Sequence, residues 1–368
     1  MRNSILAGFS EVGMQAVVNE FDMKELYHPT LFPIKQTNHL TWKSVENIAE
    51  VRQAADIVAR GTSLREKARP AFTRIDGDLP KIAVKRSMDE DKLYEYDELI
   101  SYIREDSTDA GAKARLVELW RDDLEYCYNA VTNRVEWLGL RSISTGKIQL
   151  TGENNDGVIT SFDVDYQLPS DRKRGYYSGS AAWTNKSSAK PISVDFYNAI
   201  QAGRAKGIKY RYAFMSDKTF MDFAQTDEVI KLCGTFAQNA LHVAFIPTIE
   251  TVNQVLKTIG YLRGLQIVVI DQEIAANETT GNPFVDNVVL LTQNPVLGET
   301  KWKRAIDMTV ANPIFSRAER GYVCLKKYGE EEPILEMTAG IANAFPVWQT
   351  SNLSMLIDVK NSSWNEGN

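Results

Sequence analysis

Residues 112–138, AKARLVELWRDDLEYCYNAVTNRVEWL, form the longest uninterrupted pattern in the chain. The segment contains neither glycine nor proline. Apolar positions recur every three or four residues, the period of one buried helix face: Leu116, Trp120, Leu124, Cys127, Val131, Val135 and Leu138. At 1.5 Å per residue such a helix is roughly 40 Å long. We expect it to end at Gly139 and to be the main helix of an α+β fold.

A β-hairpin and a mixed region are predicted after this helix. Strand patterns at 147–151 and 158–166 flank a polar loop, and Phe162, Val164 and Tyr166 share one face of the second strand. From residue 193 onward helical and strand patterns alternate, which indicates a compact mixed domain. Helices are expected at 194–202, closed by Gly203, and at 248–262, strands at 209–215, 265–270 and 288–292, and an N-cap at Ser216.

Two segments of opposite charge precede the long helix. Residues 60–86 hold eight basic and three acidic residues, whereas residues 89–109 hold nine acidic and two basic ones. Within the basic segment, strand patterns at 71–75 and 81–86 flank Asp76-Gly77-Asp78, which predicts a hairpin. An isolated hairpin is marginally stable in water, so we expect it to need a partner surface.

The charge reversal suggests a contact between neighbouring chains. Its candidate residues are Arg69, Arg74, Lys81, Lys85 and Arg86 on the basic side and Asp89, Glu90 and Asp91 on the acidic side. A neighbour's long helix, with Glu118, Asp122 and Asp123, is an alternative acidic partner. Two separately solvated faces are another interpretation of the same charges.

Residues 1–55 have the features of an extended arm. Pro29, Pro33 and the polar residues 35–38 interrupt any helical pattern, and apolar residues occur in short groups. Such a segment buries little of its own surface. We therefore expect the arm to lie on another surface.

The chain carries no recognisable catalytic signature. Its three histidines are His28 and His39 in the arm and His242 in an apolar stretch, where a core histidine is expected. No glycine-rich phosphate loop, HExxH or GxSxG motif is present, and the three widely spaced cysteines are expected to be buried or half-buried thiols. We therefore predict no catalytic residue, no metal site and no cofactor, and we expect a protein that is not an enzyme.

Charge and hydropathy restrict the partners. The formal net charge of −6 argues against nucleic-acid binding as the main activity. Residues 169–180 contain a basic and aromatic cluster that could clamp a nucleic-acid strand, although a mobile surface loop is the preferred interpretation. No signal peptide and no apolar run long enough for a membrane span are recognised, so no membrane partner is expected.

The order of these elements resembles that of the major capsid proteins of tailed phages, most closely the phage lambda-type major capsid protein E family. The most specific stretches are KRSMDED at 85–91, LTG at 150–152, GSAAWTNK at 179–186 and GNPFVDN at 281–287. The resemblance covers most of the chain and implies a Hong Kong 97-like fold. It implies an N-terminal arm at 1–55, an extended loop hairpin at 56–95, a peripheral domain with a long spine helix at 96–189 together with 336–368, and an axial domain at 190–335.

The resemblance also implies a function and partners. The chain would assemble with itself, as hexamers and pentamers, into an icosahedral head that encloses double-stranded DNA. It would work with a portal and a separate scaffolding protein, because no long charged helical segment precedes the arm. A decoration protein is a further candidate partner, and packaged DNA would make only weak, non-specific contacts. The expected location is the virion, with assembly in the host cytoplasm. The alternatives are the shell protein of a cellular nanocompartment and an enzyme with an unrecognised site.

Overall fold

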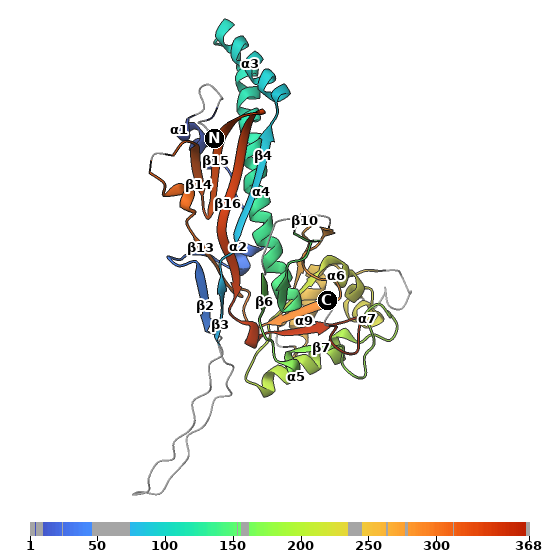
Figure 1. The fold of residues 1–368 in the computed structure, drawn as a ribbon. Coiled ribbons are helices and arrows are strands. Elements are labelled where there is room, and N and C mark those ends of the chain that lie inside the picture. Colours follow the sequence, from blue (N-terminus) through green and yellow to red (C-terminus); the bar gives the residue numbers. More distant parts are fainter. Residues whose placement is uncertain are drawn as a thin grey trace, which may run out of the picture.

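The computed structural model describes residues 4, 10–23, 25–45, 74–152, 154–155, 162–234, 245–262, 264–276, 279–311 and 313–365. An elongated part, built on helix α4 and a six-stranded sheet, is joined to a rounder part around a five-stranded sheet (Figure 1). Helix α4 runs along the first part, and its C-terminal end contributes to a core beside the second sheet.

Helix α4 spans Ala110–Thr145, so the predicted end at Gly139 is wrong. The helix ends at Gly146, which adopts a left-handed conformation with a φ of 75°. A Cβ atom on Gly139 would lie 3.4 Å from the ring of Phe32 and 3.6 Å from Pro346, which are ordinary van der Waals distances. Gly139 therefore lies inside the helix, where the arm and the sheet pack against it. The predicted buried face is confirmed, with Trp120 half-buried at its edge.

The six-stranded sheet is centred on the long strand β16. Its order is β1 (Ile34–Gln36), β13 (Gly298–Lys303), β16 (Ile334–Trp348), β15 (Val323–Glu331) and β14 (Ser316–Arg320), and β4 (Lys81–Met88) also pairs with β16. Helix α4 packs on one face, where Val131, Leu325 and Ala342 share a core. A Cβ atom on Gly340 of β16 would lie 2.6 Å from the carbonyl oxygen of Cys127, so only glycine fits this contact.

The hairpin predicted between residues 71–75 and 81–86 does not form. Strand β3 (Arg74–Asp78) pairs with β2 (Thr41–Val45), whereas β4 pairs with β16. Asp76-Gly77-Asp78 therefore lies within a strand and not in a turn. The physical reason is that Ile82 and Val84 pack into the core beneath α4, a larger apolar surface than a hairpin partner offers. Residues 46–73, which include Arg69, lie outside the described part of the chain.

The N-terminal arm packs on its own chain, which corrects the expectation that it buries little of itself. Helices α1 (Glu11–Val18) and α2 (His28–Leu31) supply buried side chains to two cores. Met14, Val18 and Phe21 join the core under α4. Leu31 and Phe32 join the core that links α4 to the five-stranded sheet. The surface on which the arm lies is therefore supplied by the same chain.

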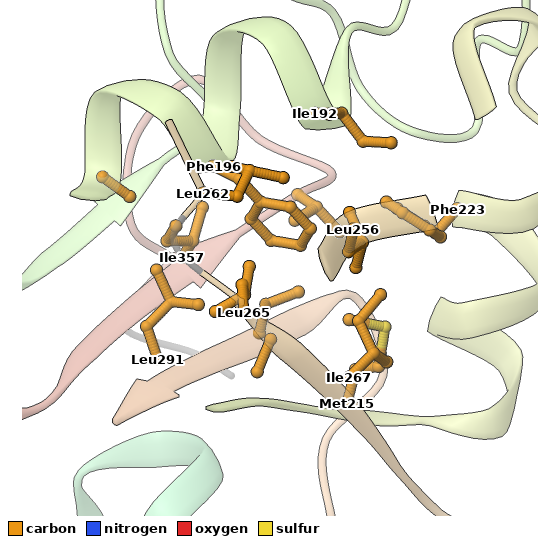
Figure 2. Close-up of a cluster of buried hydrophobic side chains, with 14 of the residues drawn as sticks. Ile192, Phe196, Met215, Phe223, Leu256, Leu262, Leu265, Ile267, Leu291 and Ile357 are labelled. Atoms are coloured by element: carbon orange, nitrogen blue, oxygen red, sulfur yellow. The ribbon is translucent and has the colours of Figure 1, made fainter. Parts of the chain in front are cut away.

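The five-stranded sheet has both faces covered. Its order is β7 (Lys173–Gly175), β17 (Met355–Asp358), β12 (Val288–Thr292), β8 (Tyr212–Ser216) and β9 (Gln266–Ile270). One face carries a core that includes Phe196, Leu256 and Leu291 (Figure 2). Leu290 points into the core shared with the C-terminal end of α4. The helical segments of this part are η2 (Pro191–Phe196), α5 (Tyr197–Ala205), α6 (Asp217–Ala224), α7 (Asp227–Cys233) and α9 (Ile249–Thr258).

The helices and strands predicted in this part form, but most of their ends are shifted. The strand predicted at 288–292 is confirmed, and Ser216 caps α6 by accepting a hydrogen bond from the Thr219 N–H at 3.3 Å. Helix α5 continues past Gly203 to Ala205. A Cβ atom on Gly203 would lie 2.5 Å from the Tyr210 ring, so the glycine allows this ring to pack against the helix. Gly203 therefore marks a close contact and not a helix end.

The remaining short elements include one confirmed hairpin and one correction. Strands β5 (Lys147–Gln149) and β6 (Asp163–Asp165) pair antiparallel, as predicted. Residues 169–180 are not the expected mobile surface loop, because β7 pairs with β17 and Arg172 and Tyr177 are buried. The other short elements are β10 (Ile274–Ala276), β11 (Thr279–Gly281), η1 (Ser170–Arg172), η3 (Ile306–Met308) and η4 (Ser351–Leu353).

The two sheets divide the chain differently from the expected boundary at residue 335. That boundary would separate β15 from β16, which pair along most of β15. Strands β13 and β14, expected in the axial domain, also lie in the six-stranded sheet, whereas β17 of the C-terminal segment lies in the five-stranded sheet. Across the described residues, no helix is both long and apolar enough to cross a membrane.

Candidate subunit interface

Strand β4 divides the predicted basic residues between two faces. Lys81 and Lys85 are exposed on the face away from α4, whereas Arg86 points to the helix side. This follows from the two-residue period of a strand. We call the face opposite α4 the outer sheet face; on β4 it consists of Lys81, Ala83, Lys85 and Ser87, all of which are exposed. Arg74 lies in β3, with its side chain outside the described part.

Arg86 contacts its own chain. Its guanidinium lies 3.3 Å from Asp122 and 3.4 Å from Asp123, both on α4, and it stacks over the Tyr126 ring at 4.7 Å. The long helix, considered as an alternative partner in a neighbour, is therefore the partner of Arg86 within the chain.

Behind Arg86 lies a group of buried charges. Asp123 is 2% exposed, and Lys327 and Glu336 are fully buried. Burial lowers the pKa of Lys327, and the nearby Asp123 and Glu336 oppose that shift. Because these groups are enclosed between α4 and the sheet, they join elements of one chain and are not available to a neighbour.

The acidic candidates begin a helix that the sequence analysis missed. Helix α3 spans Glu90–Glu105, and Asp89 caps it by accepting a hydrogen bond from the Lys92 N–H at 3.2 Å. Glu90 accepts a hydrogen bond from the Tyr94 hydroxyl at 3.3 Å, and Asp91 is exposed in the first turn. All three carboxylates are therefore exposed, and Asp89 also caps the helix.

Helix α3 projects beyond the sheet (Figure 1) and packs against α4 through one apolar side. Leu93, Tyr96, Ile100 and Ile103 are spaced by three or four residues and pack against α4. That spacing was a usable sequence signal, but the density of charge obscured it. The opposite side of α3 exposes Tyr94 at 63% and Tyr102 at 54%.

An apolar groove lies on the outer sheet face next to β1. Its volume is about 370 Å³, and Leu40, Ile306 and Ile341 line it together with Lys81 and Lys303. Ile306 is 74% exposed and Leu40 is 51% exposed. Two large apolar side chains that are exposed beside one groove indicate a candidate protein interaction site. Sequence reasoning missed these residues because periodicity does not distinguish an exposed isoleucine from a buried one.

The arm is held by a buried polar triad. His28 Nδ1 lies 2.8 Å from Glu136 Oε2, and its Nε2 lies 3.0 Å from the Tyr322 hydroxyl. The backbone N–H groups of Tyr27 and His28 also donate to Glu136, at 2.9 and 2.6 Å. The triad resembles a catalytic one, but no substrate reaches it because His28 and Glu136 are fully buried and Tyr322 is 1% exposed. Its effect is to join the arm, α4 and the sheet.

Metal-ligand clusters and cysteines are two further kinds of candidate reactive centre. No group of three or more histidine, cysteine or acidic side chains among them is placed to hold a metal ion. Cys127 and Cys324 are buried and Cys233 is half-buried, as predicted. Burial raises the pKa of the Cys127 thiol to about 11, so it stays protonated at neutral pH. His242 lies outside the described residues.

Comparisons with known proteins agree with this picture. The family described as Phage major capsid protein E matches residues 14–319. The structure is similar to that of a prophage protein of E. coli CFT073 described as a capsid protein, with a TM-score of 0.58, 14% identity and coverage of 95% of this chain and 99% of that chain. It is also similar to a phage-related protein from Bordetella bronchiseptica RB50, with a TM-score of 0.55, 13% identity and coverage of 98% of both chains. No curated protein sequence matches.

Proposed function

The chain belongs to the phage major capsid protein E family, and we propose that its copies meet in the capsid shell through the outer sheet face of one copy and helix α3 of the next. The chain has the Hong Kong 97-like capsid fold and is a shell-forming protein, not an enzyme. The match to a phage family favours a phage head over a nanocompartment shell.

The observation that carries the proposed contact is the open outer sheet face. Lys81 and Lys85 are exposed there and form no ion pair within the described residues. The adjoining groove exposes Leu40 and Ile306, apolar side chains whose burial on a partner is favourable. A contact between two different surfaces of identical chains is heterologous, and such contacts close into rings.

Helix α3 offers the complementary chemistry. Glu90 and Asp91 supply negative charge, and Tyr94 and Tyr102 supply exposed aromatic surface. Aromatic side chains are enriched in interface cores, while opposite charges orient partners. Arg86 pairs with α4 and Asp89 caps α3 within the chain, so the proposed contact relies on the other candidates and leaves Arg86 and Asp89 as predictions. Arg69 and Arg74 remain predictions.

The two sheets support a revised domain assignment. The six-stranded sheet with α3 and α4 would be the peripheral domain, and the five-stranded sheet with its helices would be the axial domain. Rings of this chain would then be hexamers and pentamers of an icosahedral head around double-stranded DNA. A scaffolding protein and a portal would assist assembly in the host cytoplasm. A decoration protein remains a candidate partner of the assembled shell. Contacts with the packaged DNA would be weak and non-specific.

The test is a charge reversal with compensation. The double change Lys81→Glu and Lys85→Glu should abolish most particle formation at low salt, measured by sedimentation, while circular dichroism stays unchanged. Each exposed pair contributes only about 0–1 kcal/mol, but the contact recurs in every subunit. Adding Glu90→Lys and Asp91→Lys should restore particles. The matched control is the double change Lys209→Glu and Lys257→Glu, which alters exposed lysines in the part around the five-stranded sheet. Undiminished yield from the first variant at low salt would refute the contact.

A further inference from the structure

A basic cleft of about 540 Å³ lies between strand β7 and helix α5, away from the outer sheet face. Arg172 is the last residue of η1 and Arg174 lies in β7, and both side chains line the cleft. Lys173, between them, turns the other way and lies 5.9 Å from the Trp364 ring. The cleft is lined by Ser170, Asp171, Arg172, Arg174, Ala202, Ala205, Lys206 and Met355.

Both guanidinium groups are held in place by tyrosines. Arg172 is 5% exposed and donates from Nη1 to the Tyr210 hydroxyl at 2.9 Å. The Tyr210 ring is buried and packs closely over Gly203 of α5. Arg174 lies 3.4 Å from the centre of the Tyr177 ring. The cations are therefore positioned before any ligand arrives, which lowers the entropy cost of binding.

The charge of the cleft is not balanced by its own lining. Three cations, Arg172, Arg174 and Lys206, stand beside a single carboxylate, Asp171. That carboxylate pairs with Lys206 and lies 3.6 Å from Arg172 Nε. The Nε atoms of both arginines are buried without a hydrogen-bond acceptor among the described residues. Fixed like charges in a partly desolvated site repel one another, and a bound anion would relieve that repulsion.

We propose that this cleft binds a phosphate group through Arg174, Lys206 and Arg172. Arginine is suited to phosphate because its planar guanidinium can donate two parallel hydrogen bonds to phosphate oxygens. The phosphate belongs either to a small soluble compound or to a nucleic-acid backbone. The inference is independent of the proposed subunit contact, because the cleft shares no residue with that contact.

Binding to the purified full-length chain tests the proposal with two ligands. Inorganic phosphate is titrated by calorimetry, and a labelled DNA duplex is followed by fluorescence anisotropy at constant chloride. Arg174→Ala and Lys206→Ala should each weaken binding about tenfold, the effect of one lost charge-assisted hydrogen bond. Lys173→Ala is the matched control, since it removes the same charge from the other side of the same strand. Circular dichroism and thermal unfolding verify that each variant is folded.

The outcomes separate the two sources. Phosphate binding that Arg174→Ala weakens, without DNA binding, supports the site and assigns it to a small phosphate compound. DNA binding that Arg174→Ala weakens and that free phosphate competes away supports the site and assigns it to the backbone. Equal binding by the Arg174→Ala and Lys173→Ala proteins, or no binding of either ligand to the wild type, overturns the proposal. Neither result would alter the prediction for shell formation.

Discussion

Strands β12 and β4 show that the two parts of this protein use burial differently. Every residue of β12 is buried, and Val289 and Leu290 enter hydrophobic cores on opposite faces of the five-stranded sheet. Along β4 burial alternates, because α4 covers one face of the six-stranded sheet and leaves Lys85 on the outer face exposed. The covered surfaces stabilise the chain, whereas the open one is available to other copies. Substitutions on the two kinds of surface should therefore separate stability from assembly.

The largest effect is expected on the covered side of the elongated part, where the arm is fixed to α4. Glu136→Ala should lower the free energy of unfolding by about 4 kcal/mol, because buried donors of Tyr27 and His28 lose their acceptor. Chemical denaturation measures the loss, and limited proteolysis should show earlier cleavage in residues 10–45. Glu136→Gln keeps an acceptor oxygen and should lose less. A loss below about 1 kcal/mol would mean that this triad does not hold the arm.

The next largest loss of stability is expected in strand β12, which is covered on both faces. Leu290→Ala removes a fully buried side chain and should cost about 3 kcal/mol. Ala83→Ser on the outer sheet face is the matched small change and should stay within about 0.5 kcal/mol. Comparable losses from the two variants, measured by denaturant unfolding, would break the distinction between covered and open strands.

Raising the pH into the alkaline range should lower the stability of the covered core under α4. Burial raises the pKa of Cys127, in the core under α4, from 9.0 to about 11. Between these values the unfolded chain has lost the thiol proton and the folded chain keeps it, so stability falls as pH rises through this window and is fully present below pH 9. At pH 10 the loss from this thiol is about 1 kcal/mol. Cys127→Ala should flatten the profile of unfolding free energy against pH by that amount. An unchanged profile would show that the thiol ionises equally in both states.

The smallest effect on stability belongs to the open face. Lys85 is exposed and forms no ion pair among the described residues, so Lys85→Ala should change unfolding free energy by less than about 0.5 kcal/mol. The same preparation should give fewer particles by sedimentation. A variant that unfolds more easily and assembles normally would reverse the roles assigned to the two faces.

Much of the fold could be predicted because its signals are local. The buried face of α4, the strand at 288–292 and the cap at Ser216 depend on spacing or on one side chain next to a helix. The candidate interface was only half predictable. The charge of Lys81 and Lys85 was visible in the sequence, but the exposure of Ile306 was not.

The sequence by itself determined which segments have helical or strand periodicity. It also determined the family resemblance and the lack of catalytic motifs. Only the tertiary structure decided that β4 leaves β3 to pair with β16, that the arm packs on its own chain, and that Arg86 contacts Asp123. Spacing records which side chains share a face, because helix and strand geometry repeat within a few residues. It does not record which distant surface covers that face, because this depends on the apolar area that each possible partner can bury.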